Sequence, residues 1–501
     1  MEIHTLTQTL ESLYGEILER EPRMAALAAE VHPRYQRSAL NLARYLVLRS
    51  HDLRPLHDPL SELGVSSLRS GEGYVLSNLH NVLGHLKRMQ DQPWDQELPE
   101  NAVGFRGSRV LQQDHTQTLF GRAEEGEGPE IMVTLSRSLA DNPEKLTRMV
   151  REGMSVARIN LARDDRPTWE KMLSGIRQAA AEAGREVRIY MDLAGPKIRM
   201  LFPREATQTH IPVAEADRIA LRREPVSLTE FEEALERYPE KPIPLNLSLG
   251  HILEQLQAGD RVSFDDGKIT AEVAAHTPGE VLLELRSAHL PQLKAQKGMN
   301  VPGKDLGLPS LTPADENNLE FVAREADIVG YSFVNRAEDV RQLYTRLDAL
   351  GAKDLGVVLK IETARAFNNL PAILLEGMKR PRIGVMIARG DLAVEVGFER
   401  VSEVQHEILW FCEAAHVPVI WATQVLDQLA KKGMATRAEI SDVTLGTRTE
   451  CIMLNKGSHI LEAIRILRTI TQRMQAHVSK KKDTARKLDV AYRSVQSLLE
   501  D

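Results

Sequence analysis

The sequence contains very little cysteine. Only Cys412 and Cys451 occur among its 501 residues, and they do not stand in the close pairs that bind zinc. Small disulfide-stabilised domains need several cysteines, and structural zinc sites need cysteines or histidines at short, fixed spacings. The sequence therefore argues against a disulfide framework and a thiolate zinc centre, and it fits a reducing compartment.

Long apolar runs and an excess of positive charge are also missing. No apolar segment approaches the roughly 18 residues that suggest a membrane span. The first residues, Met1 to His4, contain no basic stretch followed by an apolar run. The formal net charge is −7, so no basic field favours nucleic acid or anionic lipid. We expect a cytoplasmic protein with no membrane and no nucleic-acid partner.

What is present is the composition of an ordinary globular protein. Hydrophobic residues make up 42% of the chain, charged residues 27% and aromatic residues 5%. A chain of this length holds about three domains at roughly 150 residues each, although one (β/α) barrel can occupy about 250 residues. The N-terminal part has apolar residues at helical intervals, for example Leu6, Leu10 and Leu13, and residues 96–128 are polar. We predict a helical extension over residues 1 to about 95 and a linker over residues 96–128, which together make up residues 1–128.

From Ile131 onward, short apolar runs alternate with longer amphipathic stretches. This alternation is typical of strand and helix units in a parallel sheet, and eight such units close into a barrel. Helix-start signals agree, because Thr312 precedes Pro313 and Thr436 stands three residues before Glu439. The predicted fold class is α/β, a (β/α)8 TIM barrel. The predicted strands are 131–134, 156–160, 187–192, 328–333, 356–360, 383–388, 418–423 and 451–454.

The segment between the third and fourth predicted strands is too long for a loop. Two stretches within it, 259–268 and 280–285, alternate in polarity like strands around a turn. We therefore predict an inserted, mostly β domain over residues 203–302, which covers the barrel mouth as a lid. The barrel then comprises residues 129–202 and 303–478, and residues 479–501 form a C-terminal helical tail.

Polar residues collect at the ends of the predicted strands, where a barrel enzyme has its active site. Glu362 and Asp391 follow neighbouring strands, and two carboxylates at one mouth favour Mg²⁺ or Mn²⁺. Lys360 lies on the same strand face as Glu362, where an ammonium can neutralise a transferring phosphoryl group or an enolate oxygen. Arg158 and Arg199 add phosphate-binding guanidinium groups. The other strand-end residues are Thr134, Asn160, Asp192, Ser332, Arg389 and Thr423.

Eight sequence blocks, over about residues 130–475, resemble those of pyruvate kinases and occur in the same order. The resemblance implies a barrel whose lid follows the third strand. It also implies the glycolytic conversion of phosphoenolpyruvate and ADP to pyruvate and ATP. The blocks are ARIN at 157–160, MDLAGPKIR at 191–199, DDG at 265–267, KGMNVPG at 297–303, LKIE at 359–362, IARGDL at 387–392, ATQ at 422–424 and TRAE at 436–439.

The resemblance also implies roles for the residues that match these motifs. Glu362 and Asp391 match the ligands of the divalent metal, Mg²⁺ or Mn²⁺. Lys360 matches the catalytic lysine, and Arg158 matches the arginine that stabilises the transition state. Thr423 matches the threonine associated with proton delivery to the enolate. The residues matched to phosphate or cofactor binding are Asn160, Lys197, Arg199, Lys297 and Gly390.

The positions that match the family's monovalent-cation site are altered. Asn160 and Asp192 keep oxygen ligands, but Ala162 and Leu193 replace the usual serine and threonine. Potassium-dependent members carry glutamate where this chain has Lys197, whose ammonium can supply the missing positive charge. The chain thus resembles the potassium-independent branch, and we expect that K⁺ is not required.

Three loops on the nucleotide side also depart from the family pattern. They begin at Leu135, Leu161 and Asn455, and they lack the family's Gly-Pro turn, its Phe-Ser-His-Gly stretch and its Ser-Gly-Glu-Thr-Ala-Lys-Gly stretch. These changes leave open whether the site binds ADP. The family's C-terminal effector domain is expected to be absent, and the helical extension has no counterpart in ordinary members.

Three functions remain open from the sequence. The first is a Mg²⁺-dependent, K⁺-independent pyruvate kinase or a close divergent relative. The second is another enzyme of phosphoenolpyruvate or a 2-oxo acid, a decarboxylase or an aldolase-type lyase that uses the same metal and enolate. The third is a non-catalytic sensor that signals through its extension. We expect a homo-oligomer, while the nucleotide preference and the effector stay open.

Overall fold

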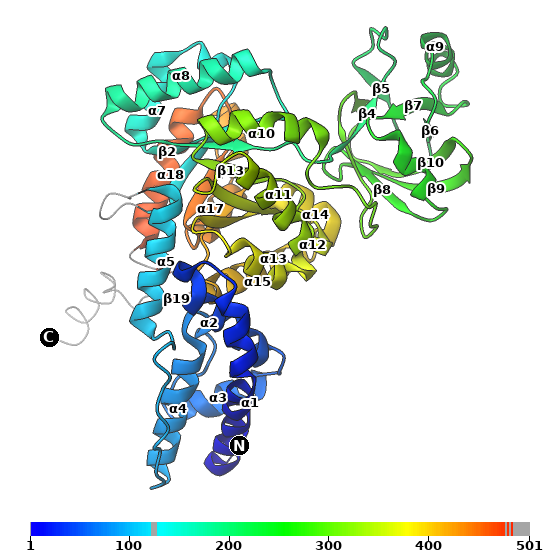
Figure 1. Ribbon diagram of the computed structural model, residues 1–501. Helices are drawn as coiled ribbons and strands as arrows, with labels where there is room; N and C mark the ends of the chain where they lie inside the picture. The colour runs from blue at the N-terminus through cyan, green and yellow to red at the C-terminus, as the bar shows by residue number, and fades with distance from the viewer. Residues whose placement is uncertain (1, 122–127, 476–477, 480–481, 484–501) are drawn as a thin grey trace, which may run out of the picture.

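Eight parallel strands close into a barrel in the computed structural model (Figure 1). The structure describes residues 2–121, 128–475, 478–479 and 482–483. Around the barrel the strands follow their order in the chain, so the predicted α/β TIM barrel is confirmed. The strands are β1 (Glu130–Thr134), β2 (Met154–Asn160), β3 (Arg188–Asp192), β13 (Ile328–Tyr331), β14 (Gly356–Ile361), β15 (Ile383–Ala388), β16 (Val419–Ala422) and β17 (Cys451–Leu454).

Helices surround this barrel, and two of them begin at the predicted caps. The side chain of Thr312 accepts a hydrogen bond from the N–H of Asp315, whose carboxylate accepts one from the N–H of Thr312. Thr436 and Glu439 form the same reciprocal pair. The helices are α6 (Arg137–Ala140), α7 (Pro143–Glu152), α8 (Arg166–Ala183), α10 (Pro313–Glu325), α11 (Ala337–Ala349), α12 (Ala364–Asn368), α13 (Leu370–Gly377), α14 (Arg389–Val396), α15 (Val401–Ala414), α16 (Asp427–Lys432), α17 (Arg437–Gly446) and α18 (Ile460–Gln475).

Helix α5 (Phe105–Phe120) closes the end of the barrel at which the strands begin. Its last residues, Leu119 and Phe120, are buried in the same hydrophobic cluster as the side chains that fill the barrel interior. Gly356 and Gly384 at the strand starts make room for it. A Cβ atom at these two positions would lie 2.9 and 2.6 Å from the methyl groups of Leu119. The barrel is therefore plugged by a residue that precedes its first strand.

The prediction of a linker over residues 96–128 is wrong where α5 lies. The helix could not be recognised from the sequence, because its buried residues form no apolar stripe at helical spacing. They are Gln112, His115, Leu119 and Phe120. Residues 122–127 of the predicted linker lie outside the described residues.

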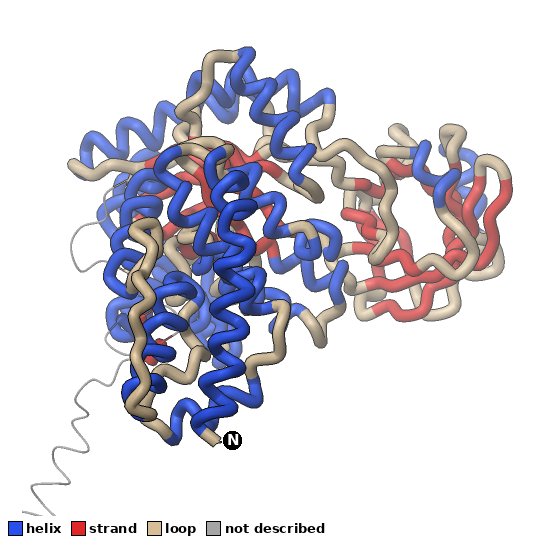
Figure 2. The backbone as a smooth tube through the Cα atoms, turned by 60° about the horizontal axis from the view of Figure 1, so that its bottom comes forward, coloured by secondary structure: helices blue, strands red, loops and turns tan. Residues whose placement is uncertain are grey.

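Four more helices precede α5 and extend away from the barrel (Figures 1 and 2). They are joined to it through buried polar contacts. The side chain of Asn41 donates hydrogen bonds to the carbonyl oxygens of Glu72 (2.7 Å) and Ala414 (2.8 Å), and His115 lies 2.7 Å from the carbonyl of His416. None of the helices in the described ranges is long and apolar enough to cross a membrane. The four helices are α1 (Ile3–Ala29), α2 (Gln36–Arg49), α3 (Arg54–Glu62) and α4 (Val75–Met89).

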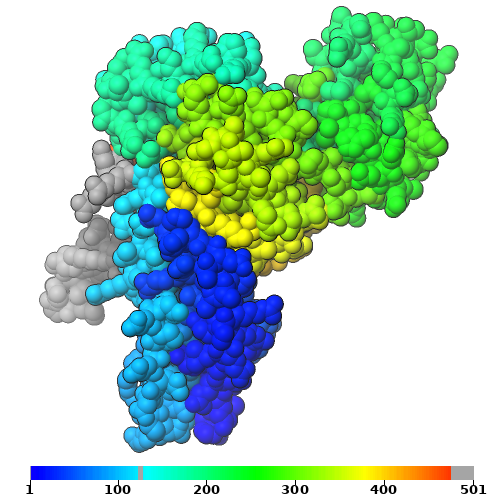
Figure 3. Space-filling model, in the orientation of Figure 1, coloured from blue at the N-terminus to red at the C-terminus, as the bar shows by residue number. Residues whose placement is uncertain are grey.

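The segment between β3 and β13 forms a second, smaller closed sheet, which stands to one side of the barrel as a separate lobe (Figure 3). This sheet begins at Ile198, because β4 pairs antiparallel with β7 and β12. The predicted domain boundary at residues 202–203 is therefore placed too late. The strands are β4 (Ile198–Leu201), β6 (Arg218–Arg222), β7 (Ile243–Leu247), β8 (Arg261–Phe264), β9 (Ile269–Thr277), β10 (Glu280–Ala288) and β12 (Gly298–Asn300), with β5 (His210–Pro212) paired to β11 (Gln292–Lys294) and one helix, α9 (Leu228–Glu236).

Most of the predicted C-terminal helical tail, residues 479–501, lies outside the described residues. The described part of it is not helical. β18 (Val478–Ser479) and β19 (Lys482–Asp483) pair as a short antiparallel ribbon instead.

Replacing the plug residue should lower the stability of the barrel. Leu119→Ala leaves a cavity at the closed end of the barrel, so we expect the free energy of unfolding to fall by about 2–5 kcal/mol. Urea denaturation followed by circular dichroism measures this change. Val110, on the same helix, is 64% exposed, and Val110→Ala should change the stability little. Equal losses in both variants would contradict the assignment of Leu119 as the plug.

Candidate active site

A polar cavity of about 250 Å³ lies where the barrel strands end. Barrel residues form its floor, and residues 265–266 and 296–298 of the inserted domain form one wall. The sequence assigned ten residues to the site, and nine of them line this cavity. The tenth, Gly390, does not line it but precedes Asp391, which does. The nine that do are Arg158, Asn160, Lys197, Arg199, Lys297, Lys360, Glu362, Asp391 and Thr423.

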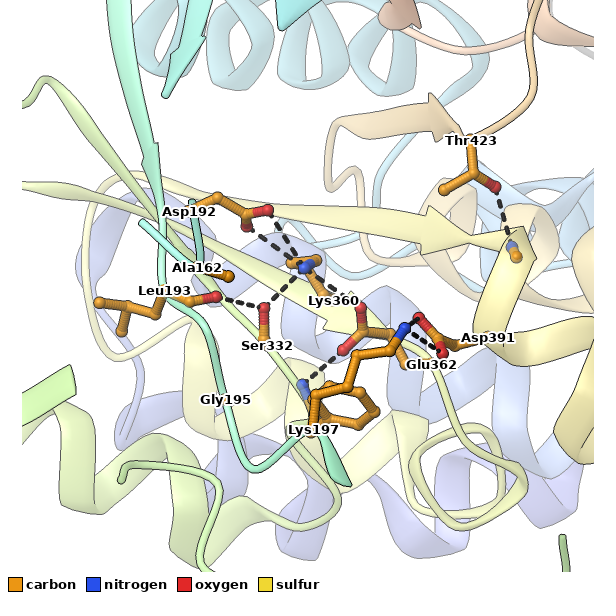
Figure 4. Close-up of polar contacts among 12 residues, drawn as sticks. Ala162, Asp192, Leu193, Gly195, Lys197, Ser332, Lys360, Glu362, Asp391 and Thr423 are labelled. Carbon is orange, nitrogen blue, oxygen red and sulfur yellow. Dashed lines mark hydrogen bonds and ion pairs between the residues drawn. The ribbon is translucent and has the colours of Figure 1, made fainter. Parts of the chain in front are cut away.

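Lys360 lies at the centre of this arrangement (Figure 4). Its ammonium nitrogen is 2.6 Å from the hydroxyl of Ser332, 3.3 Å from the carboxylate of Asp192 and 3.1 Å from that of Glu362. Burial opposes the charged form, but the two carboxylates outweigh it and raise the pKa of Lys360 above its usual value. Lys360 is thus a fixed positive charge in the wall of the cavity, and its side chain is almost completely buried.

Arg158 shares the carboxylate of Asp192 with Lys360. Its Nε lies 3.2 Å from Asp192, and its Nη1 donates a hydrogen bond of 2.9 Å to the hydroxyl of Thr134. Asp192 is only 1% exposed. Burial disfavours its charge, but Lys360 and Arg158 outweigh burial and hold the pKa of Asp192 below its usual range. One buried carboxylate therefore keeps two cations side by side.

Glu362 and Asp391 are the carboxylates in the site that fit a divalent metal. Glu362 accepts a hydrogen bond of 2.6 Å from the N–H of Phe333. Burial raises the pKa of Glu362; Lys360 opposes this shift and the Asp391 carboxylate adds to it. A divalent cation would relieve the repulsion between the two acids. No group of three or more His, Cys, Asp or Glu in the described residues forms a metal site, and Mg²⁺ commonly binds one or two carboxylates plus water and substrate phosphate.

Lys197 is bound to Asp391. Its ammonium lies 2.9 and 3.1 Å from the two carboxylate oxygens, and Figure 4 shows it pointing toward that residue. Burial works against this charge, but Asp391 outweighs it and raises the pKa of Lys197. A Cβ at Gly298 would lie 2.7 Å from Cε of Lys197, so the glycine leaves space for the lysine to reach the cavity.

The loop that carries Lys197 is bound by Asp315, which also caps the N-terminus of α10. The carboxylate of Asp315 accepts hydrogen bonds from the N–H groups of Ala194 (2.9 Å) and Gly195 (3.1 Å). Gly195 has φ +65°, and a Cβ there would lie 2.9 Å from Cβ of Ser332. Ser332 in turn donates a hydrogen bond of 2.7 Å to the carbonyl of Leu193. The loop and the residue that contacts Lys360 therefore fit together only with glycine at position 195.

Thr423 follows β16, and hydrogen bonds from Gly390 and Arg389 hold it in place. Its hydroxyl oxygen accepts a hydrogen bond of 2.8 Å from the N–H of Gly390, which leaves the hydroxyl hydrogen free to donate. Arg389 donates to the carbonyls of Ala422 (2.9 Å) and Thr423 (2.7 Å) and pairs with Asp442. Gly390 thus contributes a backbone donor to Thr423.

The remaining predicted residues lie at the rim. Lys297 is 2.6 Å from the carboxylate of Asp265, and Arg199 donates a hydrogen bond of 3.1 Å to the carbonyl of Gln296. Burial, and after it the nearby Arg163, lower the pKa of Arg199. The side-chain oxygen of Asn160 accepts a hydrogen bond from Ala162. Two of these rim residues, Lys297 and Arg199, are positively charged.

Ser332 and Asp315 support the site but were not assigned to it from the sequence. Ser332 was recognised only as a polar strand end, and Asp315 received no role. Its spacing from Thr312 could have identified Asp315 as a cap, but no sequence signal connects a cap on α10 with a loop after β3. Ser332 could not be distinguished from the many serines that end strands at a protein surface.

A family model described as pyruvate kinase, barrel domain, matches residues 128–460. The chain belongs to the pyruvate kinase family. It is 31% identical to a pyruvate kinase of Bacillus licheniformis over 350 residues, which is 68% of this chain and 56% of that protein. A pyruvate kinase of Geobacillus stearothermophilus is 32% identical over 345 residues, 67% of this chain and 55% of that protein. Pyruvate kinase 2 of Trypanosoma brucei brucei is 29% identical over 356 residues, 69% of this chain and 67% of that protein.

The matched region is the barrel and its insertion. The chain spans a little over half the length of the bacterial pyruvate kinases that it matches. The helices before residue 128 lie outside the family match. The family match therefore covers the barrel segments that line the cavity, and a helical module is attached at the opposite end of the barrel.

Removing the carboxylate that the two cations share should destabilise the fold. Asp192→Asn leaves Arg158 and Lys360 buried with less compensating charge, so we expect the free energy of unfolding to fall by about 3–5 kcal/mol. Urea denaturation measures this loss. Asp141→Asn removes a carboxylate from the exposed pair with Lys171 and should have little effect. A loss at Asp192 as small as that at Asp141 would contradict the central role of the buried cluster.

Proposed function

We propose that this chain catalyses Mg²⁺-dependent transfer of the phosphoryl group from phosphoenolpyruvate to ADP, giving pyruvate and ATP, without a requirement for K⁺. The observation that carries the proposal is the buried ammonium of Lys360 between Asp192 and Glu362, in a cavity that also holds Arg158 and Asp391. The similarity of the chain to proteins that are named pyruvate kinases supports the proposal. The homo-oligomeric assembly and cytoplasmic location expected from the sequence belong to this proposal.

In the proposed reaction, the bond between phosphorus and the enol oxygen breaks while a β-phosphate oxygen of ADP bonds to phosphorus. Phosphoryl transfer of this kind depends on positioning and on neutralising charge more than on covalent chemistry. Lys360 and Arg158 supply fixed positive charges for the phosphoryl group and the developing enolate. Bound Mg²⁺, held by Glu362 and Asp391, would add charge neutralisation on the phosphate oxygens. The inserted domain forms one wall of the cavity, and its closure over the barrel mouth would exclude water from the transferring group.

The enolate left by the transfer needs a proton on its methylene carbon to become pyruvate. Thr423 lines the cavity, and the backbone N–H of Gly390 already occupies a lone pair of its oxygen. This arrangement directs the free hydroxyl hydrogen away from Gly390. It supports the role of Thr423 in delivering the proton.

The three altered loops surround one further cavity, of about 340 Å³, which borders the first at Arg158 and Asn160. Besides Arg158, three further cations line it, Arg163, Lys431 and Lys456. We assign the nucleotide to this side. Its phosphates would lie between these cations and the rim residues Arg199 and Lys297, so the altered loops replace the family's nucleotide contacts with other basic groups.

The tethered ammonium of Lys197 takes the place of a bound potassium ion in this proposal. Two of the four monovalent-cation positions, Ala162 and Leu193, have no side-chain oxygen. Lys197 lies in the same cavity and is bound to Asp391. A covalently attached charge is always present, so the reaction would not depend on the concentration of K⁺.

Turnover of phosphoenolpyruvate and ADP by the purified protein with Mg²⁺ tests the reaction. We expect pyruvate and ATP in equal amounts, at the same rate with and without K⁺. Lys360→Met should abolish turnover, because no other fixed cation contacts both Asp192 and Glu362 in the described structure. Lys171→Met, at an exposed lysine, is the control. No turnover with binding of oxalate and Mg²⁺ intact would point instead to a lyase or a sensor.

A second variant tests the assignment of Lys197. Lys197→Met removes the tethered charge, so we expect kcat without K⁺ to fall by about 10²-fold, the usual effect of losing one preorganised electrostatic group. Lys197→Arg should retain more of the rate. Steady-state kinetics with and without K⁺ measures both. An unchanged kcat in Lys197→Met would contradict the proposal that Lys197 takes the place of a bound potassium ion.

A further inference from the structure

A third cavity, of about 590 Å³, lies where the inserted domain joins the barrel. Its walls include Ile198 and Asn300, which belong to the two strands by which the chain enters and leaves the inserted sheet. The opposite wall is made by barrel residues such as Asn335 and Asn369. Helices α12 and α14 lie on the side of the barrel nearest the inserted domain (Figure 1). The volume is in the range that holds a small organic molecule.

Five charged side chains line this cavity, and one of them, Glu395, has no ion-pair partner among the described residues. Each of the other four has an ion-pair partner of opposite charge, and two of the four pair with each other. The ion pairs that neutralise them are Lys197 with Asp391, Lys304 with Asp260, and Arg365 with Asp305. Glu395 is thus the one acidic side chain of the lining that has no partner of opposite charge in the described structure.

Glu395 lies on α14, one turn after Asp391. The N–H of Gly303 hydrogen-bonds its carboxylate, and this contact links α14 to the segment that returns from the inserted domain. Burial, and after it the Asp391 carboxylate, raise the pKa of Glu395 to about 7. The carboxylate is therefore short of stabilising positive charge, and a cation beside it would supply that charge.

The rest of the lining favours an organic cation over a metal ion. The other acidic side chain of the lining, Asp305, is already paired with Arg365, so Glu395 has no second free carboxylate in the lining with which to hold a metal ion. Apolar side chains such as Met299, Leu306 and Phe333 form a large part of the wall, and carboxamides from Asn300 and Asn368 lie among them. Such a wall suits a molecule with an apolar body and one charged end.

We propose that this cavity binds a small organic cation, an amine or guanidine with an apolar body, whose charged group pairs with Glu395. The cavity adjoins the active-site cavity, with which it shares Lys197 and Phe333, but its occupation requires neither phosphoenolpyruvate nor nucleotide. Because the walls come from both the barrel and the inserted domain, a bound molecule contacts both sides of the joint. Occupation of this cavity therefore favours one orientation of the inserted domain.

Ligand-observed NMR titrations with two matched probes test the proposal. The probes are 2-phenylethylamine, which is cationic, and 2-phenylethanol, its neutral counterpart of the same shape. The full chain is titrated without phosphoenolpyruvate, nucleotide or Mg²⁺, so the result does not depend on catalysis. We expect the amine to bind about tenfold more tightly than the alcohol, because a charge-assisted hydrogen bond forms only with the amine.

Two variants assign the difference to Glu395. Glu395→Gln keeps the shape of the side chain and removes its charge, so the advantage of the amine should disappear. Glu399→Gln makes the same charge change at an exposed position and should retain the advantage. Equal binding of amine and alcohol to the unmodified chain would overturn the proposal without any variant. An advantage that survives in Glu395→Gln, or is lost equally in Glu399→Gln, would overturn it as well.

Discussion

The ammonium of Lys360 is the interaction on which the rest of the site depends. It contacts Asp192 at the end of β3, Ser332 just after β13 and Glu362 just after β14, and so joins three consecutive elements of the barrel. Without it, Glu362 would lose the cation that contacts it, and Asp192 would keep only Arg158. With it, Asp192 holds two cations, and Glu362 remains in place beside Asp391. The order of the barrel strands thus brings the groups of the proposed phosphoryl transfer to one place.

The two ends of the barrel have separate tasks. At the end where the strands begin, Leu119 and Phe120 of α5 fill the interior, and Gly356 and Gly384 admit them. At the other end the strands finish in charged side chains. This division is general in barrels of this type, where the C-terminal face carries function. The N-terminal helices are attached at the plugged end, so they contact the barrel away from the proposed chemistry.

The sequence predicted what depends on local pattern. Apolar runs marked all eight strands, and the strand-end chemistry of Lys360, Glu362 and Asp391 marked the cavity before the structure placed it. The misses have a common physical origin. α5 is held by two residues inserted into a distant core, and β4 belongs to the inserted sheet through partners far along the chain. The contacts of Asp315 with Ala194 and of Lys197 with Asp391 also join segments that are far apart in sequence, so neither spacing nor periodicity reveals them.

The most direct measurement of the central claim follows the phosphorus atom of phosphoenolpyruvate. ³¹P NMR of the protein with phosphoenolpyruvate, Mg²⁺ and no K⁺, recorded before and after addition of ADP, reports where that phosphorus goes. The account predicts a stable phosphoenolpyruvate signal before ADP and its replacement by the γ-phosphate signal of ATP afterwards. Release of inorganic phosphate, or a phosphoenolpyruvate signal that persists after ADP is added, would contradict it.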